Sequence, residues 1–131
     1  MTLEQTPENT VRKAGGISIH AVDIAGGTPA AGLAVRLWRL DGADRHPVAA
    51  GSCGDSGLLD HPGATGMGIV AGIYEVEFDT GAFYRAKGAS IPSPSFLEVA
   101  VFRFGIAQVE EHFHLPFKFT PWGFSLFRGG A

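Results

Sequence analysis

Apolar and polar residues alternate along several short segments of the chain, a pattern typical of strands that bury one face. Residues 17–22 alternate, residues 73–78 alternate strictly, and turn-forming residues follow each segment. Other segments are rich in β-branched and aromatic residues and are separated by glycine and proline. The strands expected from this pattern are residues 17–22, 33–40, 47–53, 73–78, 96–104, 110–119 and 122–128.

Helix signals are scarce, and only residues 81–87 are expected to form a helix. Asp79 or Thr80 can cap its first turn, and Gly88 can end it. Seven or eight short strands and one helix in a chain of 131 residues are typical of two antiparallel sheets packed face to face. We therefore predict an all-β sandwich domain over residues 17–131, preceded by a flexible polar tail over residues 1–16.

Composition narrows the class of protein. Hydrophobic residues make up 45% of the chain, which excludes general disorder, yet no apolar run reaches the roughly 20 residues of a membrane helix. The net charge of −3 gives no basic surface for nucleic acid, and the single cysteine, Cys53, excludes an intramolecular disulfide. Residues 1–16 lack the apolar segment of a signal peptide, so we expect a cytoplasmic protein. Motifs for nucleotide binding, serine nucleophiles and metalloproteases are missing, and no cofactor is expected.

Candidate chemistry gathers on one face of the strand at residues 110–119. Period two places His112, His114, Pro116 and Lys118 on that face and apolar side chains on the other, which is the expected core side. A solvated outer face is the simplest interpretation. Pro116 speaks against it, because proline donates no hydrogen bond to a neighbouring strand and suits an edge, a bulge or a site.

A further histidine, His20, lies on the polar face of residues 17–22 and can move protons near neutral pH. His112 and His114 have the same-face spacing of a zinc site on a strand, and His20 could be a third ligand, but such pairs also occur by chance and no cysteine supports them. We therefore expect no metal. His46 and His61 each precede a proline in loop-like sequence, and we expect both on the surface.

Three segments of the chain share the order and spacing of known motifs. Residues 19–33 contain I-H-A-V-D and then G-T-P-A-A-G-L, residues 72–80 read G-I-Y-E-V-E-F-D-T, and residues 112–130 read H-F-H-L-P-F-K-F-T-P-W-G-F-S-L-F-R-G-G. Over residues 17–130 the chain resembles the transthyretin-like family, in its 5-hydroxyisourate hydrolase branch. The resemblance implies a two-sheet transthyretin-like sandwich with one short helix and a homotetramer whose channel holds the sites. It also implies a small-molecule substrate, 5-hydroxyisourate, whose ring is opened by water.

The resemblance also implies which residues of this chain have the roles of the hydrolases' active-site residues. His20 and His114 match the catalytic histidines of the hydrolases, and Arg128 matches their terminal arginine. A histidine base that activates water fits the ring-opening reaction.

Departures from the family pattern change the expected site. Leu58 stands where the hydrolases have a catalytic arginine, Phe127 and Gly130 replace a tyrosine and a serine, and Lys118 replaces a leucine. Lysine supplies the charge of the lost arginine but not its planar fork. Among aromatic neighbours Lys118 would either be partly desolvated and act as a third catalytic residue, or extend its ammonium group from the channel to water. Substrate contacts are expected from Leu58, Pro116, Ser125, Phe127, Arg128 and Gly130.

Three functions remain open from the sequence. The first is an enzyme of this family that hydrolyses or rearranges another small cyclic substrate, as the lost arginine and serine favour. The second is a genuine 5-hydroxyisourate hydrolase of urate degradation. The third is a non-catalytic binder of small molecules, like transthyretin, which the retained histidine pair disfavours.

Overall fold

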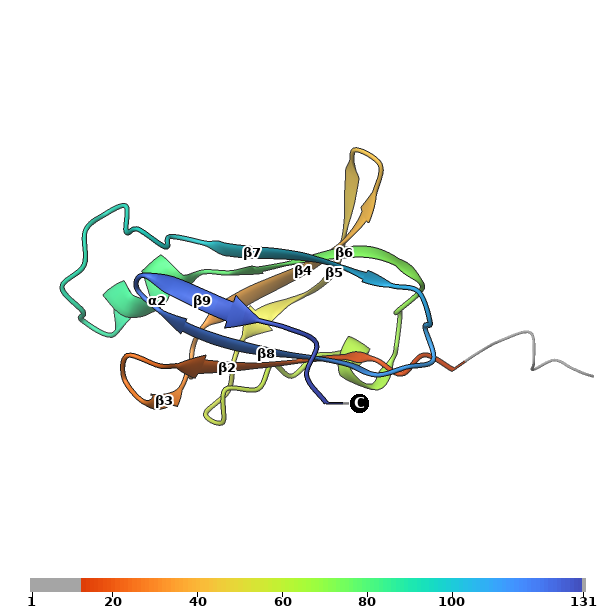
Figure 1. The fold of residues 1–131 in the computed structure, drawn as a ribbon, viewed down its shortest axis with the longest axis horizontal. Coiled ribbons are helices and arrows are strands. Elements are labelled where there is room, and N and C mark those ends of the chain that lie inside the picture. The colour runs from red at the N-terminus through yellow and green to blue at the C-terminus, as the bar shows by residue number, and fades with distance from the viewer. Residues whose placement is uncertain (1–12, 131) are drawn as a thin grey trace, which may run out of the picture.

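The computed structural model describes residues 13–130 and shows two sheets packed face to face, with one α-helix at one end (Figure 1). The strands are β2 (Ile17–Asp23), β3 (Thr28–Pro29), β4 (Ala34–Asp41), β5 (Asp44–Ser52), β6 (Gly72–Phe78), β7 (Ala100–Ile106), β8 (Phe113–Thr120) and β9 (Gly123–Leu126); the helix α2 is Thr80–Ala86 and a 3-10 turn, η1, is Pro62–Thr65. One sheet has the order β3-β2-β8-β9 and the other β5-β4-β6-β7. The predicted all-β sandwich with one short helix is confirmed.

Strand β2 runs parallel to β8, whereas the other strand pairs are antiparallel. The register pairs Ser18 with His114 and His20 with Pro116. Ser18 and His114 are 96 residues apart in the sequence, and all four strands of the second sheet lie between them along the chain. This pairing joins the first and last sequence motifs on one surface.

The core between the sheets is aromatic. Phe78 of β6 stacks on Phe117 of β8 with ring centroids 3.7 Å apart, and Tyr84 of α2 packs edge to face on Phe119 at 5.5 Å. Alternate residues of β2 and β8 are buried, and the residues between them face outward. The face assignments predicted from the alternation are confirmed, and they place His20 and His114 outside the core.

Neither Asp79 nor Thr80 caps the start of α2 with its side chain, although the sequence predicts that one of them would. Asp79 precedes the helix without capping it, and its carboxylate accepts two hydrogen bonds of 2.8 Å from Arg36. These bonds hold the pKa of Asp79 below its usual value. The Thr80 hydroxyl donates to the Leu97 carbonyl at 2.7 Å, so both predicted caps serve tertiary contacts instead.

The predicted N-terminal tail falls mostly on residues 1–12, which lie outside the described residues. Gly15 donates from its amide to the Val109 carbonyl at 2.9 Å, and the Gly16 carbonyl accepts from the Phe113 amide at 2.9 Å. Backbone contacts with the sandwich thus begin ahead of Ile17.

His61 is buried, and its expected surface position is wrong. Its side chain is 8% exposed, and Nε2 lies 2.7 Å from the carbonyl oxygen of Ile17. Pro62, read as a loop signal, begins the turn η1 and folds His61 back onto β2. His46 is exposed as expected, although it lies within β5 and not in a loop.

Candidate active site

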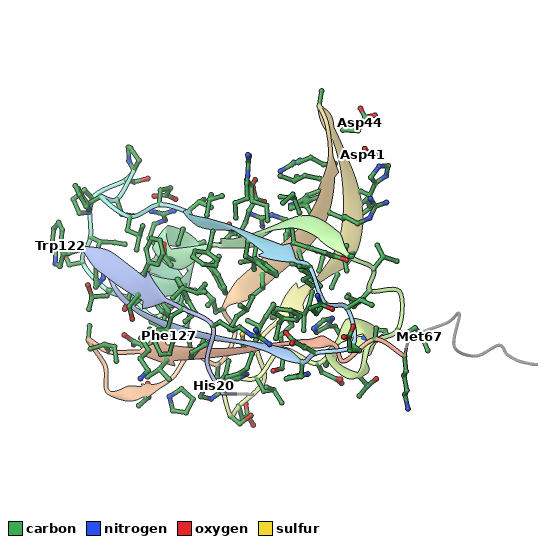
Figure 2. All side chains as sticks on the ribbon, turned by 45° about the vertical axis from the view of Figure 1, so that its right-hand side comes forward. His20, Asp41, Asp44, Met67, Trp122 and Phe127 are labelled. Carbon is green, nitrogen blue, oxygen red and sulfur yellow. The ribbon has the colours of Figure 1, made fainter. Side chains whose placement is uncertain are left out.

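The outer face of β2 and β8 brings the candidate residues together. Ser18 and His20 lie on β2, and the parallel register places them beside His114 and Pro116 of β8. All four residues are partly exposed. His20 lies at the lower edge of the molecule in Figure 2, on the side opposite the tip of the β4–β5 hairpin.

The turn at residues 54–58 closes one side of this face. Leu58 forms an isolated antiparallel bridge with His20, and the Ala21 amide donates to the Gly57 carbonyl at 2.8 Å. Gly57 has φ +86°, and a Cβ there would lie 2.3 Å from the Ala21 oxygen, so only glycine lets the turn approach β2. The turn therefore presents Leu58, 46% exposed, next to His20.

His20 has one ring nitrogen engaged. Its Nε2 lies 2.8 Å from the Ser56 carbonyl oxygen. A carbonyl oxygen can only accept, so Nε2 carries the proton and Nδ1 of the neutral ring remains a proton acceptor.

Next to the contact between His20 and Ser56, three further side chains form a row of hydrogen bonds. Ser18 Oγ lies 2.7 Å from Nδ1 of His114 and 2.8 Å from Nε2 of His112, and Nδ1 of His112 lies 2.7 Å from the Gly15 carbonyl oxygen. Sequence reasoning gave Ser18 no role and considered His112 only as a zinc ligand. Their shared faces were visible in the alternation, but the parallel pairing that joins them was not.

The surroundings of His114 favour its neutral form by lowering its pKa. Burial lowers the pKa of His114, and the nearby His20 and His112 lower it further. The unprotonated ring is the form that can accept a proton from water.

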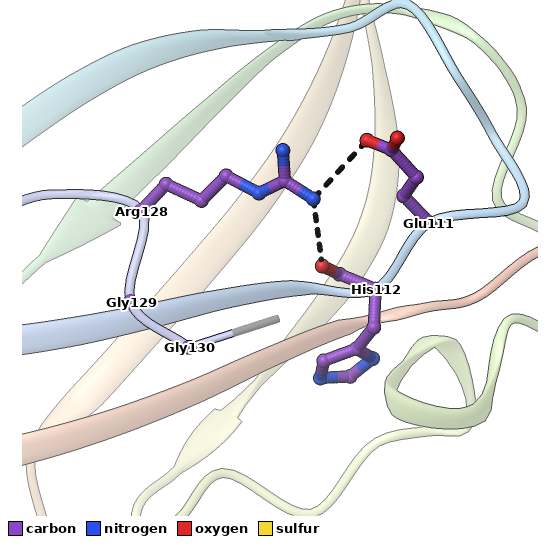
Figure 3. A pocket seen from close by; sticks show the side chains of 5 residues that line it. All are labelled: Glu111, His112, Arg128, Gly129 and Gly130. Atoms are coloured by element: carbon purple, nitrogen blue, oxygen red, sulfur yellow. Dashed lines mark hydrogen bonds and ion pairs between the residues drawn. The ribbon is translucent and has the colours of Figure 1, made fainter.

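A cavity of about 520 Å³ opens beside this face, lined by Glu111, His112, Arg128, Gly129 and Gly130 (Figure 3). Arg128 Nη2 lies 3.2 Å from Glu111 Oε1 and 3.1 Å from the His112 carbonyl oxygen, and its guanidinium carbon lies 4.1 Å from the centre of the Phe113 ring. Arg128 and Gly130, both predicted contact residues, thus line the cavity, and the Arg128 charge is already paired.

Gly129 connects the cavity to the histidine face. Its amide donates to the His114 carbonyl at 2.8 Å. A Cβ on Gly129 would lie 3.0 Å from Pro116 and 3.2 Å from His114 Cδ2, so this close approach favours glycine.

Lys118 lies away from His114, toward the end of β8. Lys118 is exposed and pairs with Ser125 across β8 and β9. Lys118 is four positions after His114, which is ~13 Å along an extended strand. Phe127 is itself 52% exposed. The expected desolvation of Lys118 among aromatic side chains is not found in the single chain.

Two other properties of residues 13–130 bear on function. No three His, Cys, Asp or Glu side chains in this range gather as a metal ion would require. No helix in the same range is long and apolar enough to cross a membrane.

Comparison with known proteins identifies relatives of this chain. The sequence model of the HIUase/Transthyretin family matches residues 17–129. The chain belongs to this family. 5-Hydroxyisourate hydrolase 2 of Rhizobium meliloti is 39% identical over 117 residues, which cover 89% of this chain and 98% of that protein. The 5-hydroxyisourate hydrolase of Ralstonia nicotianae is 38% identical, over 88% of this chain and 98% of its own length. The resemblance seen in the three motifs is confirmed.

Solved structures agree with this family. The (S)-allantoin synthase structure matches with a TM-score of 0.82 at 30% identity, over 91% of this chain and 45% of that chain. Klebsiella pneumoniae 5-hydroxyisourate hydrolase matches with a TM-score of 0.72 at 32% identity, over 88% of this chain and 99% of that chain. Sea bream transthyretin in complex with thyroxine has a TM-score of 0.77 at 24% identity over 88% of this chain and 96% of its own, a likeness that shows the fold alone.

Proposed function

We propose that this member of the HIUase/transthyretin family adds water to a small cyclic amide or ureide, with His114 as the general base. The observation that supports this most is the pair of imidazoles, His20 and His114, on one partly exposed face beside a cavity. The neutral His114 ring takes a proton from water, and the hydroxide adds to a ring carbonyl. The C–N bond then breaks, and the imidazolium returns its proton to the departing nitrogen.

His20 is the second proton-transfer group of this proposal. Its Nε2 is held by the Ser56 carbonyl, so Nδ1 is the atom that can exchange a proton with substrate or water. Pro116, Leu58 and Phe127 supply apolar contacts around the ring, and Arg128 and Gly130 border the cavity. Lys118, with Ser125 opposite, supplies positive charge farther along the face.

The proposed substrate differs from 5-hydroxyisourate because position 58 carries no charge. An arginine there would offer a planar fork to a carbonyl oxygen that becomes negative during water addition, and Leu58 offers only an apolar contact. The second candidate is 5-hydroxyisourate itself. It is favoured by the relatives of that name, which are 39% and 38% identical over almost their full length.

We also propose a cytoplasmic homotetramer in which the outer face of the β3-β2-β8-β9 sheet lines a channel. Trp122 and Phe127 are exposed near this face, and an outer surface that mixes apolar and polar groups usually meets a partner. Sedimentation at micromolar concentration should give a tetramer. A monomer would contradict the assembly.

The test of function is a hydrolysis assay on freshly generated 5-hydroxyisourate and on a panel of five- and six-membered cyclic ureides and imides. We expect slow turnover of 5-hydroxyisourate and faster turnover of a panel member. His114→Asn should lower the rate about 10²–10⁴-fold. His46→Asn, at an exposed histidine on the other sheet, is the matched control.

Efficient, His114-dependent turnover of 5-hydroxyisourate would favour the second candidate. Absence of turnover with every compound, or equal losses in both variants, would contradict catalysis by the histidine face.

A further inference from the structure

We propose that Ser18 and His112 are positioning residues that hold His114 with Nδ1 protonated and leave its Nε2 as the proton acceptor. The inference deepens the proposed function and rests on it for the role of His114. It concerns two residues outside the proposed catalytic pair, and it follows from one directed chain of hydrogen bonds.

The row of hydrogen bonds ends at the Gly15 carbonyl, and this end sets the direction of each bond in the row. The Gly15 carbonyl cannot donate, so Nδ1 of His112, 2.7 Å away, donates to it. In the neutral ring, Nε2 of His112 is then an acceptor, and the Ser18 hydroxyl at 2.8 Å donates to it. The Ser18 oxygen remains free to accept, and Nδ1 of His114 at 2.7 Å is its donor. In the neutral ring, Nε2 of His114 is therefore unprotonated.

Contacts with the loop before β8 hold Gly15 in place. The Gly15 amide donates to the Val109 carbonyl at 2.9 Å, in the loop that leads into β8. A Cβ on Gly15 would lie 2.4 Å from the carbonyl carbon of Glu111, so a larger residue would push the two segments apart. The Gly15 carbonyl is thus fixed against the same loop that carries His112.

A hydroxyl at position 18 is required because its donation to His112 leaves its oxygen as the acceptor for His114. The parallel register puts Ser18 beside His114, and the hydroxyl accepts from one ring while it donates to the other. Alanine would leave Nδ1 of His114 to water, which both donates and accepts and therefore imposes no tautomer. Threonine would keep the hydroxyl.

The experiment reads the tautomer directly. Long-range ¹H–¹⁵N spectra of the histidine rings, assigned with His114→Asn, should show His114 with Nδ1 protonated in the wild type. Ser18→Ala should shift the ring toward the Nε2-protonated form, and Ser18→Thr should restore it. Ser90→Ala, at an exposed serine in the loop after α2, is the matched control and should change nothing.

Steady-state kinetics, measured on whichever compound the wild type hydrolyses, give a second test of the positioning role of Ser18. Supporting groups that orient a functional histidine are typically worth about 10–100-fold in activity. Ser18→Ala should lower kcat by that factor with little change in KM, and Ser18→Thr should recover most of it.

Two results would overturn the proposal whatever the substrate is: an Nε2-protonated His114 in the wild type, or an unchanged tautomer in Ser18→Ala. If the wild type hydrolyses nothing, the proposed function fails while the spectra still decide the positioning role. If Ser18→Ala does not fold, His112→Ala gives the same test. Without its acceptor, the Ser18 hydroxyl can turn and donate to Nδ1 of His114, so the tautomer preference should be lost.

Discussion

The backbone of Leu58 is paired with that of His20, so the residue at position 58 stands directly beside the imidazole. The turn that carries Leu58 is fixed on both sides: the Gly57 carbonyl accepts from Ala21 at 2.8 Å, and the Leu59 amide donates to Ile19 at 3.0 Å. Because the side chain of Leu58 is exposed, it can be exchanged without disturbing the core. Position 58 is therefore the most direct place to test what this site lacks.

Leu58→Arg should raise the hydrolysis of 5-hydroxyisourate by about tenfold or more, since a single donor to a developing oxyanion is worth about 10²–10³-fold in other enzymes. Steady-state kinetics with fresh substrate measure the effect, and Leu58→Met, a similar side chain without charge, is the control. Equal effects of the two substitutions would show that charge at position 58 is not what limits the reaction.

Lys118→Met tests the proposed role of the second cation. Lys118 is exposed and far from His114 along β8, so we expect it to attract an anionic substrate and not to transfer the proton. The substitution should raise KM several-fold at low salt, leave kcat nearly unchanged, and lose its effect at high salt, where exposed charges are screened. Lys13→Met, an exposed lysine ahead of β2, is the control. A KM that is unchanged at every salt concentration would remove Lys118 from the site.

Much of the fold could be predicted because the alternation of β2, β6 and β8 is local and strict. Each of these strands buries every second residue, and the sandwich follows from burying those faces. The ends of elements were harder to predict. Residues 44–46 were assigned to a loop and belong to β5, because their pairing with residues 39–41 of β4 decides the state and not their own composition.

The residues of the candidate site could be named from the sequence, but their arrangement in space could not be predicted. The motifs indicated His20, His114 and Leu58, and the bridge between Leu58 and His20 agrees with that grouping. Ser18 was missed, because a serine on a polar face acquires a role only when β2 pairs with β8 in this register. His61 was misplaced, since a histidine before proline is typical of loops and only tertiary contact with the Ile17 carbonyl buries it.

His61→Ala should reduce stability and not catalysis. The ring is buried, its Nε2 donates to Ile17, and its removal would leave both a void and a backbone carbonyl without this donor. We expect the free energy of unfolding to fall by about 2 kcal/mol, as for other buried hydrogen-bonded groups. Urea denaturation measures this, with His46→Ala as the control that should stay within about 0.5 kcal/mol of wild type. A large loss of kcat with unchanged stability would instead place His61 in the active site.

The lowered pKa of His114 predicts a pH-dependent loss of stability. Between its folded value and the ordinary value of 6.5, the unfolded chain binds a proton that the folded chain does not, so stability rises with pH across that interval and falls as the solution is acidified. Asparagine at this position cannot titrate, so His114→Asn should lose less stability than wild type between about pH 7 and about pH 5. Glu77 and Asp79 also have lowered pKa values, but their ordinary values of 4.5 and 3.8 confine their effect to more acidic solution, where both proteins should lose stability in parallel. Urea denaturation at several pH values measures the difference, and parallel curves from neutral to mildly acidic pH would show that His114 is not held in its neutral form.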